Sequence, residues 1–276
     1  MKKSTFEKNK PNWSYEEISQ EIKIFCDLYD KRPIKNNIGG MFCNHAFALY
    51  FILKKNKPDL VIESGVFKGQ STWLIEKTLP TTKLICIDVD LSKRVYISEK
   101  AHYSNLDFKF HDFSKMPPNT LVLFDDHVNH IERIRDANYF NIKNIILEDN
   151  YPSGLGDFQT IKQCYEKHSF KHQLTIFSIF KTFYLFIEIL LKKVLIKKYN
   201  ASYNLYLLHN RIRDYYLHNN EFNNLNKIIE TYYEFPPISN EEMNSGKSIF
   251  IKNNDKLDKY QSELMRYNYL TYIKLR

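Results

Sequence analysis

The sequence predicts an α/β protein built on a doubly wound, mostly parallel sheet, and three observations favour this fold class. Short apolar runs rich in β-branched residues recur between residues 60 and 149, and most are followed by a stretch with helical periodicity. Several of these runs end in an acidic residue. Gly65 and Gly69, two of only seven glycines, stand directly after the first run. Apolar strands that alternate with helices are typical of a parallel sheet covered on both faces.

The chain is expected to begin with helices and then to alternate strands with helices. Two helices are expected over about 14–28 and 41–55, the second ending before Pro58. Strands are expected at 60–64, 83–88, 106–112, 120–125 and 143–149. Helices are expected at about 70–79, 92–101, 129–139 and 157–168. Strand patterns return at 248–251 and 267–275, and we expect the last strand to pair antiparallel at the edge of the sheet.

This order of elements divides the chain into four segments. Residues 1–57 form an N-terminal helical segment, 58–168 the α/β core, 169–246 a helical insertion, and 247–276 the strands that complete the sheet. A chain of 276 residues is long enough for one such domain with additions. Its hydrophobic content of 43% is ample for a core.

Cysteine usage and the N-terminus predict a cytoplasmic protein. The four cysteines form no C-x-x-C pair and are typical of reduced, buried thiols. Residues 1–10 lack the apolar region of a secretory signal peptide.

The net charge of +8 is concentrated in one segment. Residues 171–213 contain eight Lys or Arg and one acid, Glu188, so the rest of the chain is nearly neutral. A general nucleic-acid-binding surface would spread its basic residues more widely, so we expect no nucleic-acid partner.

Within this segment, residues 175–196 are strongly apolar with a narrow polar stripe of Lys181, Glu188 and Lys192. The pattern favours a core helix or a subunit-interface helix of a homo-oligomer. A peripheral membrane contact through 175–198 is the alternative, because several lysines follow the apolar run.

The glycine spacing and the acids near it indicate which ligand the turn binds. A dinucleotide-binding turn has the pattern G-x-G-x-x-G, whereas here Gly65 and Gly69 stand four residues apart and Glu63 precedes them. A carboxylate in the turn repels phosphate but suits a cationic amine. S-adenosylmethionine (SAM) carries an amino group and a sulfonium, and its ribose diol suits an acid such as Asp88. The alternative is a plain strand–helix–strand unit whose glycines only shape a turn.

Acidic residues at the ends of predicted strands are the second sign of a site. Asp88, Asp112, Asp125 and the pair formed by Glu148 and Asp149 all stand where strands are expected to finish. In open α/β sheets, ligands bind at the carboxyl ends of the strands. A single acid there is ordinary solvation of a strand end, but five acids on four strand ends indicate a shared site.

Carboxylates on two neighbouring strands predict a Mg²⁺ site. Asp125 ends one expected strand, and Glu148 and Asp149 end the next. Mg²⁺ prefers carboxylate and water oxygens. An ion there could hold a sugar diol, lower the pKa of a hydroxyl and direct its oxygen at a methyl group. His127 could then take the proton, and a surface or helix-capping role is the alternative for this residue.

The pattern E-x-G-x-x-x-G-x-[ST], from Glu63 to Ser71, resembles motif I of the class I SAM-dependent methyltransferases. The acids of the fourth and fifth strands resemble the metal-dependent branch typified by the macrolide-sugar O-methyltransferases and the cephalosporin-hydroxylase-like family. The resemblance covers about 58–168 and implies a Rossmann-like fold. The cofactor-binding residues that it implies are Glu63, Gly65, Gly69, Ser71, Asp88 and, nearest the adenine, Asp112. The metal ligands that it implies are Asp125, Glu148 and Asp149.

The resemblance leaves the catalytic base open. In that branch a His lies three residues after the acid of the fourth strand. Here His127 lies two residues after Asp125 and one after Asp126, and His130 lies further on. His127, Asp126 and His130 are therefore the candidate catalytic residues.

The activity implied is Mg²⁺-assisted, SAM-dependent O-methylation of a hydroxyl on a small molecule or glycan, such as a sugar or glycosylated metabolite in glycan biosynthesis. Two other classes stay open. Asp88 and Asp90 form a D-x-D pattern, as in nucleotide-sugar glycosyltransferases, although the glycine turn would then have no task. A non-catalytic subunit of the same fold could dock on a membrane or partner through 171–213.

Overall fold

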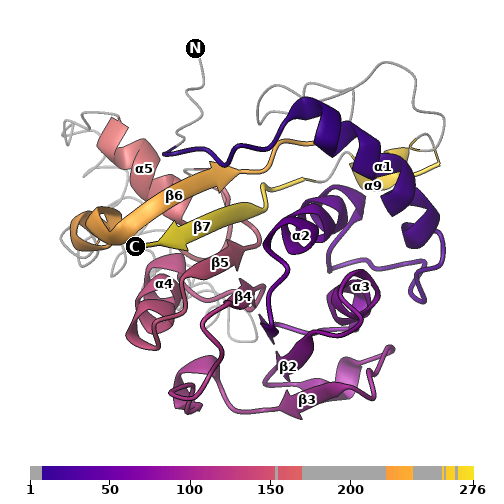
Figure 1. Ribbon diagram of the computed structural model, residues 1–276, viewed down its shortest axis with the longest axis horizontal. Helices are drawn as coiled ribbons and strands as arrows, with labels where there is room; N and C mark the ends of the chain where they lie inside the picture. The colour runs from indigo at the N-terminus through magenta and orange to yellow at the C-terminus, as the bar shows by residue number, and fades with distance from the viewer. Residues whose placement is uncertain (1–7, 153–154, 170–221, 239–256, 258, 265–266) are drawn as a thin grey trace, which may run out of the picture.

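The computed structural model describes the chain except for residues 1–7, 153–154, 170–221, 239–256, 258 and 265–266. A seven-stranded sheet with the order β3-β2-β1-β4-β5-β7-β6 crosses the molecule (Figure 1). Its strands are β1 (Leu60–Ser64), β2 (Lys83–Ile87), β3 (Ala101–Ser104), β4 (Thr120–Phe124), β5 (Asn144–Leu147), β6 (Ile229–Glu234) and β7 (Thr271–Leu275). The first five strands are parallel, and β7 runs antiparallel to both β5 and β6. The predicted fold class is confirmed.

Helices cover both faces of the sheet (Figure 1). The helices are α1 (Tyr15–Tyr29), α2 (Cys43–Asn56), α3 (Gln70–Thr78), α4 (His130–Tyr139), α5 (Ile161–Ser169) and α9 (Gln261–Leu264), with short 3₁₀ turns η1 (Leu91–Lys93) and η2 (Phe108–Phe110). Residues of α1, α2 and α3 share one apolar cluster with the sheet, and residues of α4 and α5 share the other. Alternate strand residues supply the two clusters: Leu121 and Leu123 of β4 face the first, and Val122 and Phe124 the second.

Helix α2 is the most enclosed helix described, because every residue from Cys43 to Leu53 is buried. It packs against α1, α3 and α9. Helix α1, which precedes α2 in the chain, begins at a capping box. The Ser14 hydroxyl accepts from the backbone N–H of Glu17, and the Glu17 carboxylate accepts from the backbone N–H of Ser14. Polar residues inside α2, Asn44 and His45, are therefore carried deep into the molecule.

The third strand differs from the prediction. It was expected at 106–112, but β3 spans Ala101–Ser104 and the later residues form η2. The alternation of Leu106, Phe108 and Phe110 looks like a strand, but the Asp107 carboxylate accepts from the N–H of Lys109 and starts a 3₁₀ turn that buries Phe108 alone. The expected helix at 92–101 is wrong for a similar reason, since Asp90 caps the short turn η1 and β3 begins at Ala101.

The C-terminal part contains one strand that was predicted and one that was not. The last strand is antiparallel as expected, but it does not lie at the edge, because β6 pairs with its outer side. β6 lies inside the span assigned to a helical insertion. The expected strand at 248–251, and the basic segment 171–213 with its apolar run 175–198, lie outside the described residues.

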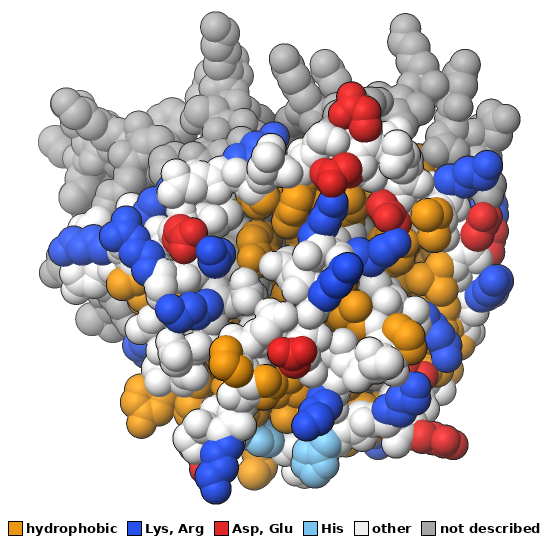
Figure 2. Space-filling model, viewed as in Figure 1, with side chains coloured by type: hydrophobic (Ala, Val, Ile, Leu, Met, Phe, Trp, Pro, Cys, Tyr) orange, Lys and Arg blue, Asp and Glu red, His pale blue; other side chains and the backbone are white. Residues whose placement is uncertain are grey.

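Three further observations bear on the earlier predictions. On the face seen in Figure 2, Lys and Arg side chains are spread among acidic and apolar ones rather than gathered in one patch. No helix in the described part of the chain is long and apolar enough to cross a membrane. All four cysteines are free and buried.

Candidate functional site

A pocket of about 380 Å³ opens at the carboxyl ends of β1, β2 and β4. This is the edge of the sheet where open α/β proteins bind their ligands. Most of its lining comes from the ends of strands: Ser64 and Gly65 at the end of β1, Ile87 to Asp90 at the end of β2, Asp107 after β3, and Asp125 to Val128 after β4. The remaining lining residues are Gly39 and Gly40 ahead of α2, Phe67, Lys93, and Arg133 on α4.

Both glycines of the turn are required by close approaches of the backbone. Gly65 has a φ of 99°, and a Cβ there would lie 2.0 Å from the carbonyl oxygen of Asp125. Gly69, the N-cap of α3, has a φ of 87°, and its Cβ would lie 2.4 Å from the carbonyl oxygen of Tyr96. Gly65 lines the pocket as predicted, whereas Gly69 lies against Tyr96 and is not part of the lining.

Asp88 orders the turn. One of its carboxylate oxygens accepts from the backbone N–H groups of Val66 and Phe67, both at 2.8 Å, and the other from the N–H of Asp90 at 2.9 Å. Asp90 in turn accepts from Ser92 and pairs with Lys93. The two acids thus serve the backbone and a 3₁₀ turn, an arrangement unlike the shared metal site of a D-x-D motif.

Glu63 does not point into the pocket as expected. Its side chain is buried on the α3 side of β1, where it accepts from the Thr72 hydroxyl at 2.6 Å and the Cys86 thiol at 3.1 Å. Burial raises its pKa to about 7. Ser71 is also buried on α3 and does not line the pocket. Alternation along β1 explains the difference, because it turns Glu63 to the face opposite Ser64.

Asp112 is displaced by the shift of the third strand. It is exposed, stands beyond η2, and accepts from the N–H of Ser114 outside the pocket lining. Asp107 takes the place at the pocket wall. Although burial raises the pKa of Asp107, the Arg133 guanidinium, at 2.7 and 3.1 Å, holds it below its ordinary value.

Arg133 joins two acidic residues of the pocket lining, Asp107 and Asp126. Its buried guanidinium also pairs with Asp126 at 2.8 Å, and Asp126 accepts from the Ser64 hydroxyl at 2.5 Å. Asp126, one of the candidate catalytic residues, is therefore held by two partners from β1 and α4. Arg133 and Asp107 were not predicted; an Arg among the apolar positions of the helix expected at 129–139 was the available signal.

Carboxylates crowd at the ends of β4 and β5, as predicted. Burial and the charge of Asp149 raise the pKa of Asp125 to about 8. Burial, with Asp125 and Asp149, also raises the pKa of Glu148. Among the ion pairs of the described residues, none joins these three acids to a Lys or Arg. Asp149 has a φ of 55°, a conformation that costs on the order of 1–3 kcal/mol and is concentrated at functional sites.

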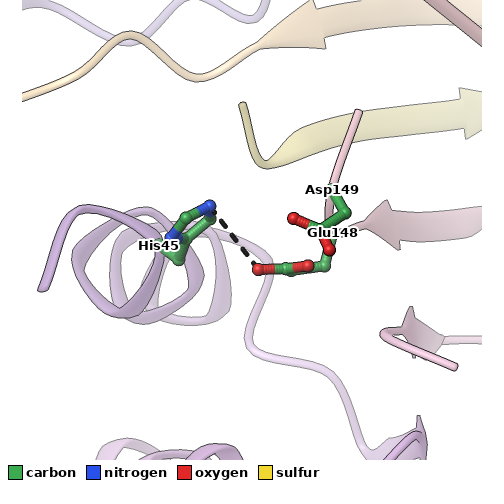
Figure 3. A group of neighbouring side chains, drawn as sticks. All are labelled: His45, Glu148 and Asp149. Atoms are coloured by element: carbon green, nitrogen blue, oxygen red, sulfur yellow. Dashed lines mark ion pairs between the residues drawn. The ribbon is translucent and has the colours of Figure 1, made fainter. Parts of the chain in front are cut away.

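His45 approaches this cluster from α2 (Figure 3). Its Nε2 lies 3.5 Å from Oε1 of Glu148, and one ligand atom each of His45, Glu148 and Asp149 lie within 4.8 Å of one another. Burial lowers the pKa of His45 to about 4, against the raising effect of Asp149, so the imidazole is neutral at pH 7. A neutral imidazole beside two carboxylates is a donor set that fits a divalent metal. Sequence analysis missed this residue, and the available signal was a polar pair, Asn44 and His45, in an otherwise apolar helix.

The two predicted histidines differ in their surroundings. His127 stands half-exposed at the pocket rim with a φ of 55°, and its Nδ1 lies 3.2 Å from Asp157, whose hydrogen bond raises the pKa of His127 to about 9. His130 is buried, and burial lowers its pKa to about 3. Its Nδ1 accepts from the N–H of Ile161 and its Nε2 faces the carbonyl oxygen of Glu148. Both nitrogens of His130 thus serve the backbone.

Comparisons with known proteins find methyltransferases among the solved structures to which this chain is similar. No family model and no curated protein matches the sequence. A CmcI structure with SAH is 21% identical over 46% of this chain and 72% of that chain, with a TM-score of 0.36. A Geobacter sulfurreducens methyltransferase is 13% identical over 51% and 73%, with a TM-score of 0.34. The SAH-bound Podospora anserina methyltransferase PaMTH1 is 8% identical over 97% and 99%, with a TM-score of 0.45. The fold itself follows from the seven-stranded, mostly parallel sheet with helices on both faces, which is Rossmann-like.

Proposed function

We propose that this protein is a SAM-dependent O-methyltransferase whose acceptor is a hydroxyl of a sugar or glycosylated metabolite. One observation carries the proposal: the pocket at the ends of β1, β2 and β4 adjoins a group of metal-type ligands at the ends of β4 and β5, of which Glu148 is buried while Asp125 and Asp149 are partly exposed. Asp125 to Val128 line the pocket and also border the crevice beside Glu148 and Asp149, which is too narrow to hold a water molecule. A methyl donor in the pocket would stand next to an acceptor oxygen held at these carboxylates.

The charge of the pocket supports SAM over a phosphate-bearing cofactor. Its lining has five carboxylates, from Asp88, Asp90, Asp107, Asp125 and Asp126, against three basic side chains, Lys93, Arg133 and His127. Arg133 is already paired with two of the carboxylates. Phosphates would be repelled from such a surface, whereas an ammonium and a sulfonium are attracted to it. Asp88, at the pocket wall with its turn already ordered, is the acid proposed to face the ribose.

We propose that Asp125, Glu148 and Asp149 hold a divalent cation, with Mg²⁺ the ion expected from the resemblance. The raised pKa values of Asp125 and Glu148 support this, because carboxylates without a compensating charge take up protons instead. When bound, such an ion lowers the pKa of an acceptor hydroxyl and fixes its orientation.

His127 is the proposed base. In the transfer, the bond between the methyl carbon and the sulfonium sulfur breaks with its electron pair going to sulfur, and a bond forms between that carbon and the acceptor oxygen. The hydroxyl proton passes to Nε2 of His127, whose Nδ1 is held by Asp157. His127 gives up its own proton more easily once Asp125 and Asp149 are neutralised, because both carboxylates raise its pKa. The Phe158 ring, packed edge-on to His127 at 5.7 Å, offers an apolar wall for a sugar face.

A direct test separates this function from the alternatives. Titration calorimetry with SAM, SAH and a UDP-sugar should show binding of the first two only, followed by transfer of radiolabelled methyl from SAM to members of a panel of sugars and glycosides. Binding of the UDP-sugar without SAM would favour the glycosyltransferase, against which the contacts of Asp88 already speak. SAM binding with no transfer to any hydroxyl acceptor would favour a non-catalytic subunit.

Membrane contact and oligomerisation through 175–198 stay predictions, tested by sedimentation with anionic vesicles and by light scattering.

A further inference from the structure

His45 is a buried polar residue without the partners that a core histidine ordinarily has. It is 3% exposed and stands in the apolar helix α2. Among the described residues, no group accepts from or donates to its Nδ1. The Tyr267 ring packs on the imidazole, with ring centroids 4.7 Å apart, and fixes the ring plane. A buried imidazole with an unused nitrogen is costly, so the presence of His45 in this apolar helix calls for an explanation.

The other nitrogen lies close to a carboxylate. The backbone N–H of Asn268 donates to Nε2 at 3.2 Å, so Nε2 carries no proton, and a cation bound to its single lone pair would replace this hydrogen bond. Oε1 of Glu148 lies 3.5 Å from the same nitrogen, and Figure 3 shows the imidazole directed at this carboxylate with Asp149 beside it. Two acceptor atoms that face each other in a buried site are stabilised by a cation shared between them.

We propose that Nε2 of His45 is a ligand of the cation held by Glu148 and Asp149, and that this nitrogen makes the site select a first-row transition metal such as Mn²⁺ over Mg²⁺. The proposal rests on the cation site of the proposed function and goes beyond it in naming a ligand from α2 and the class of metal. It also departs from the ion that the resemblance implied.

The geometry and the donor chemistry both favour this assignment. Ligands of an ion with bonds of about 2.1 Å lie up to about 4.2 Å apart, so ligand atoms within 4.8 Å of one another need to close by well under 1 Å. Mg²⁺ prefers oxygen ligands and keeps several of its waters. An imidazole nitrogen binds Mn²⁺ more weakly than it binds Zn²⁺, but more strongly than it binds Mg²⁺. Asn268, which holds the ring from one side, also donates its Nδ2–H to Asp149 at 3.1 Å and so keeps both ligands in register.

The experiment compares metal affinities of the whole chain, His45→Gln and a matched control. Asn44→Ser alters the neighbouring buried residue of α2, whose side chain contacts Leu264 and Ile238 instead of the carboxylates. Calorimetric titration should show tighter binding of Mn²⁺ than of Mg²⁺ by the unaltered protein. His45→Gln should lower the Mn²⁺ affinity at least about 10-fold, since loss of even an outer-shell partner has an effect of that size. Mg²⁺ affinity should change by less than about threefold, and Asn44→Ser should change neither. An equal loss of both ions in His45→Gln, or tighter binding of Mg²⁺ by the unaltered protein, would overturn the proposal.

A spectroscopic measurement on the unaltered protein tests the ligand assignment even where the variant fails to fold. The Mn²⁺-loaded protein should show electron spin-echo modulation from a coordinated ¹⁴N of imidazole, and His45→Gln should lose it. Bound Mn²⁺ without nitrogen modulation would refute the ligand assignment. SAM titrations on the same samples keep the two proposals apart. SAM binding with no metal binding would end the metal assignment and leave the cofactor pocket standing, whereas absence of SAM binding would end the proposed function itself.

Discussion

The two ends of the site's rim neutralise their carboxylates in different ways. After β2, the carboxylate of Asp88 accepts from two backbone N–H groups of the glycine turn and from that of Asp90, at 2.8 to 2.9 Å. After β4 and β5, Asp125, Glu148 and Asp149 face one another and the neutral His45, and burial with mutual repulsion raises the pKa of Asp125 and Glu148. The first end is completed by the chain itself. The carboxylates at the second end need protons or a cation to balance their charge. The charge of a ligand can therefore be inferred from the charges that the protein itself does not compensate.

Removing divalent cations should have the largest effect and should touch the second end alone. We expect methyl transfer to be lost in EDTA and restored by added metal, while SAM affinity stays within about threefold. Metal at 100 times its dissociation constant should add about 2.7 kcal/mol to the free energy of unfolding, a rise in Tm of about 5–10 °C. Asp149→Asn should lower kcat more than SAM affinity. Full activity in EDTA would break the comparison, because both ends would then be complete without an ion.

Replacing His127 should separate chemistry from binding at the second end. His127→Ala should lower kcat by about 10²–10⁴, the range of general acid–base catalysis, with SAM affinity unchanged. His130→Ala should instead lower the free energy of unfolding, because both ring nitrogens of His130 hold backbone groups in a buried position. Steady-state kinetics and thermal melts of the two variants measure these effects. A normal kcat in His127→Ala would remove this residue as the base.

At the first end, Asp88→Ala should weaken SAM binding by about 10- to 150-fold, corresponding to 1.5–3 kcal/mol for a hydrogen bond to a charged group. The turn loses the acceptor of Val66 and Phe67 together with a pocket carboxylate. Asp112→Ala is the matched control, since its exposed side chain accepts from the N–H of Ser114 outside the pocket lining. Calorimetry measures both variants, and equal SAM affinities in the two would show that the turn does not depend on Asp88.

Glu63→Gln should have the smallest effect on the cofactor, a change in SAM affinity below about threefold, because the side chain lies outside the pocket lining. Its effect should appear in stability. The pKa of Glu63 is raised to about 7 in the folded protein, so the protonated carboxyl stabilises the fold below its ordinary pKa of 4.5, and this contribution is lost as pH rises through 7. Glu63→Gln should therefore be more stable than the unaltered protein at pH 8, by on the order of 2–3 kcal/mol, and not at pH 4. Denaturant titrations at both pH values test this, and a difference that does not change with pH would contradict it.

The central strands could be predicted from the sequence, but the edge strands could not. β1, β2 and β4 are continuous apolar runs whose ends fall within one residue of the prediction, because burial on both faces leaves a strong pattern. β3, with the sequence Ala-His-Tyr-Ser, is half-exposed and has little apolar alternation. The alternation at Leu106 to Phe110 is the stronger strand pattern, although these residues do not form the strand. β6 depends on pairing with β7, some 40 residues later in the chain, and a local pattern does not report such a partner.

The candidate site divides in the same manner. The rule that parallel strands end at one edge was sufficient to bring Asp88, Asp125, Glu148 and Asp149 to that edge. Residues whose placement depends on one face of a strand or on packing between helices were missed or misplaced. Glu63 turned to the opposite face, Asp112 moved with the third strand, and His45 reaches the acids from a helix more than 100 residues earlier in the chain.

The approach of Gly65 to the carbonyl oxygen of Asp125 has an evolutionary consequence. The turn that would receive the methyl donor and the strand that leads to the acids touch main chain to main chain, with no room for one additional carbon atom. A single exchange to alanine there would disable both ends of the site, and no side chain elsewhere could absorb the clash. We therefore expect acceptor preference to change through side chains beside the acids, such as Phe158 and the Tyr151 ring 6.4 Å from it, and not through this turn.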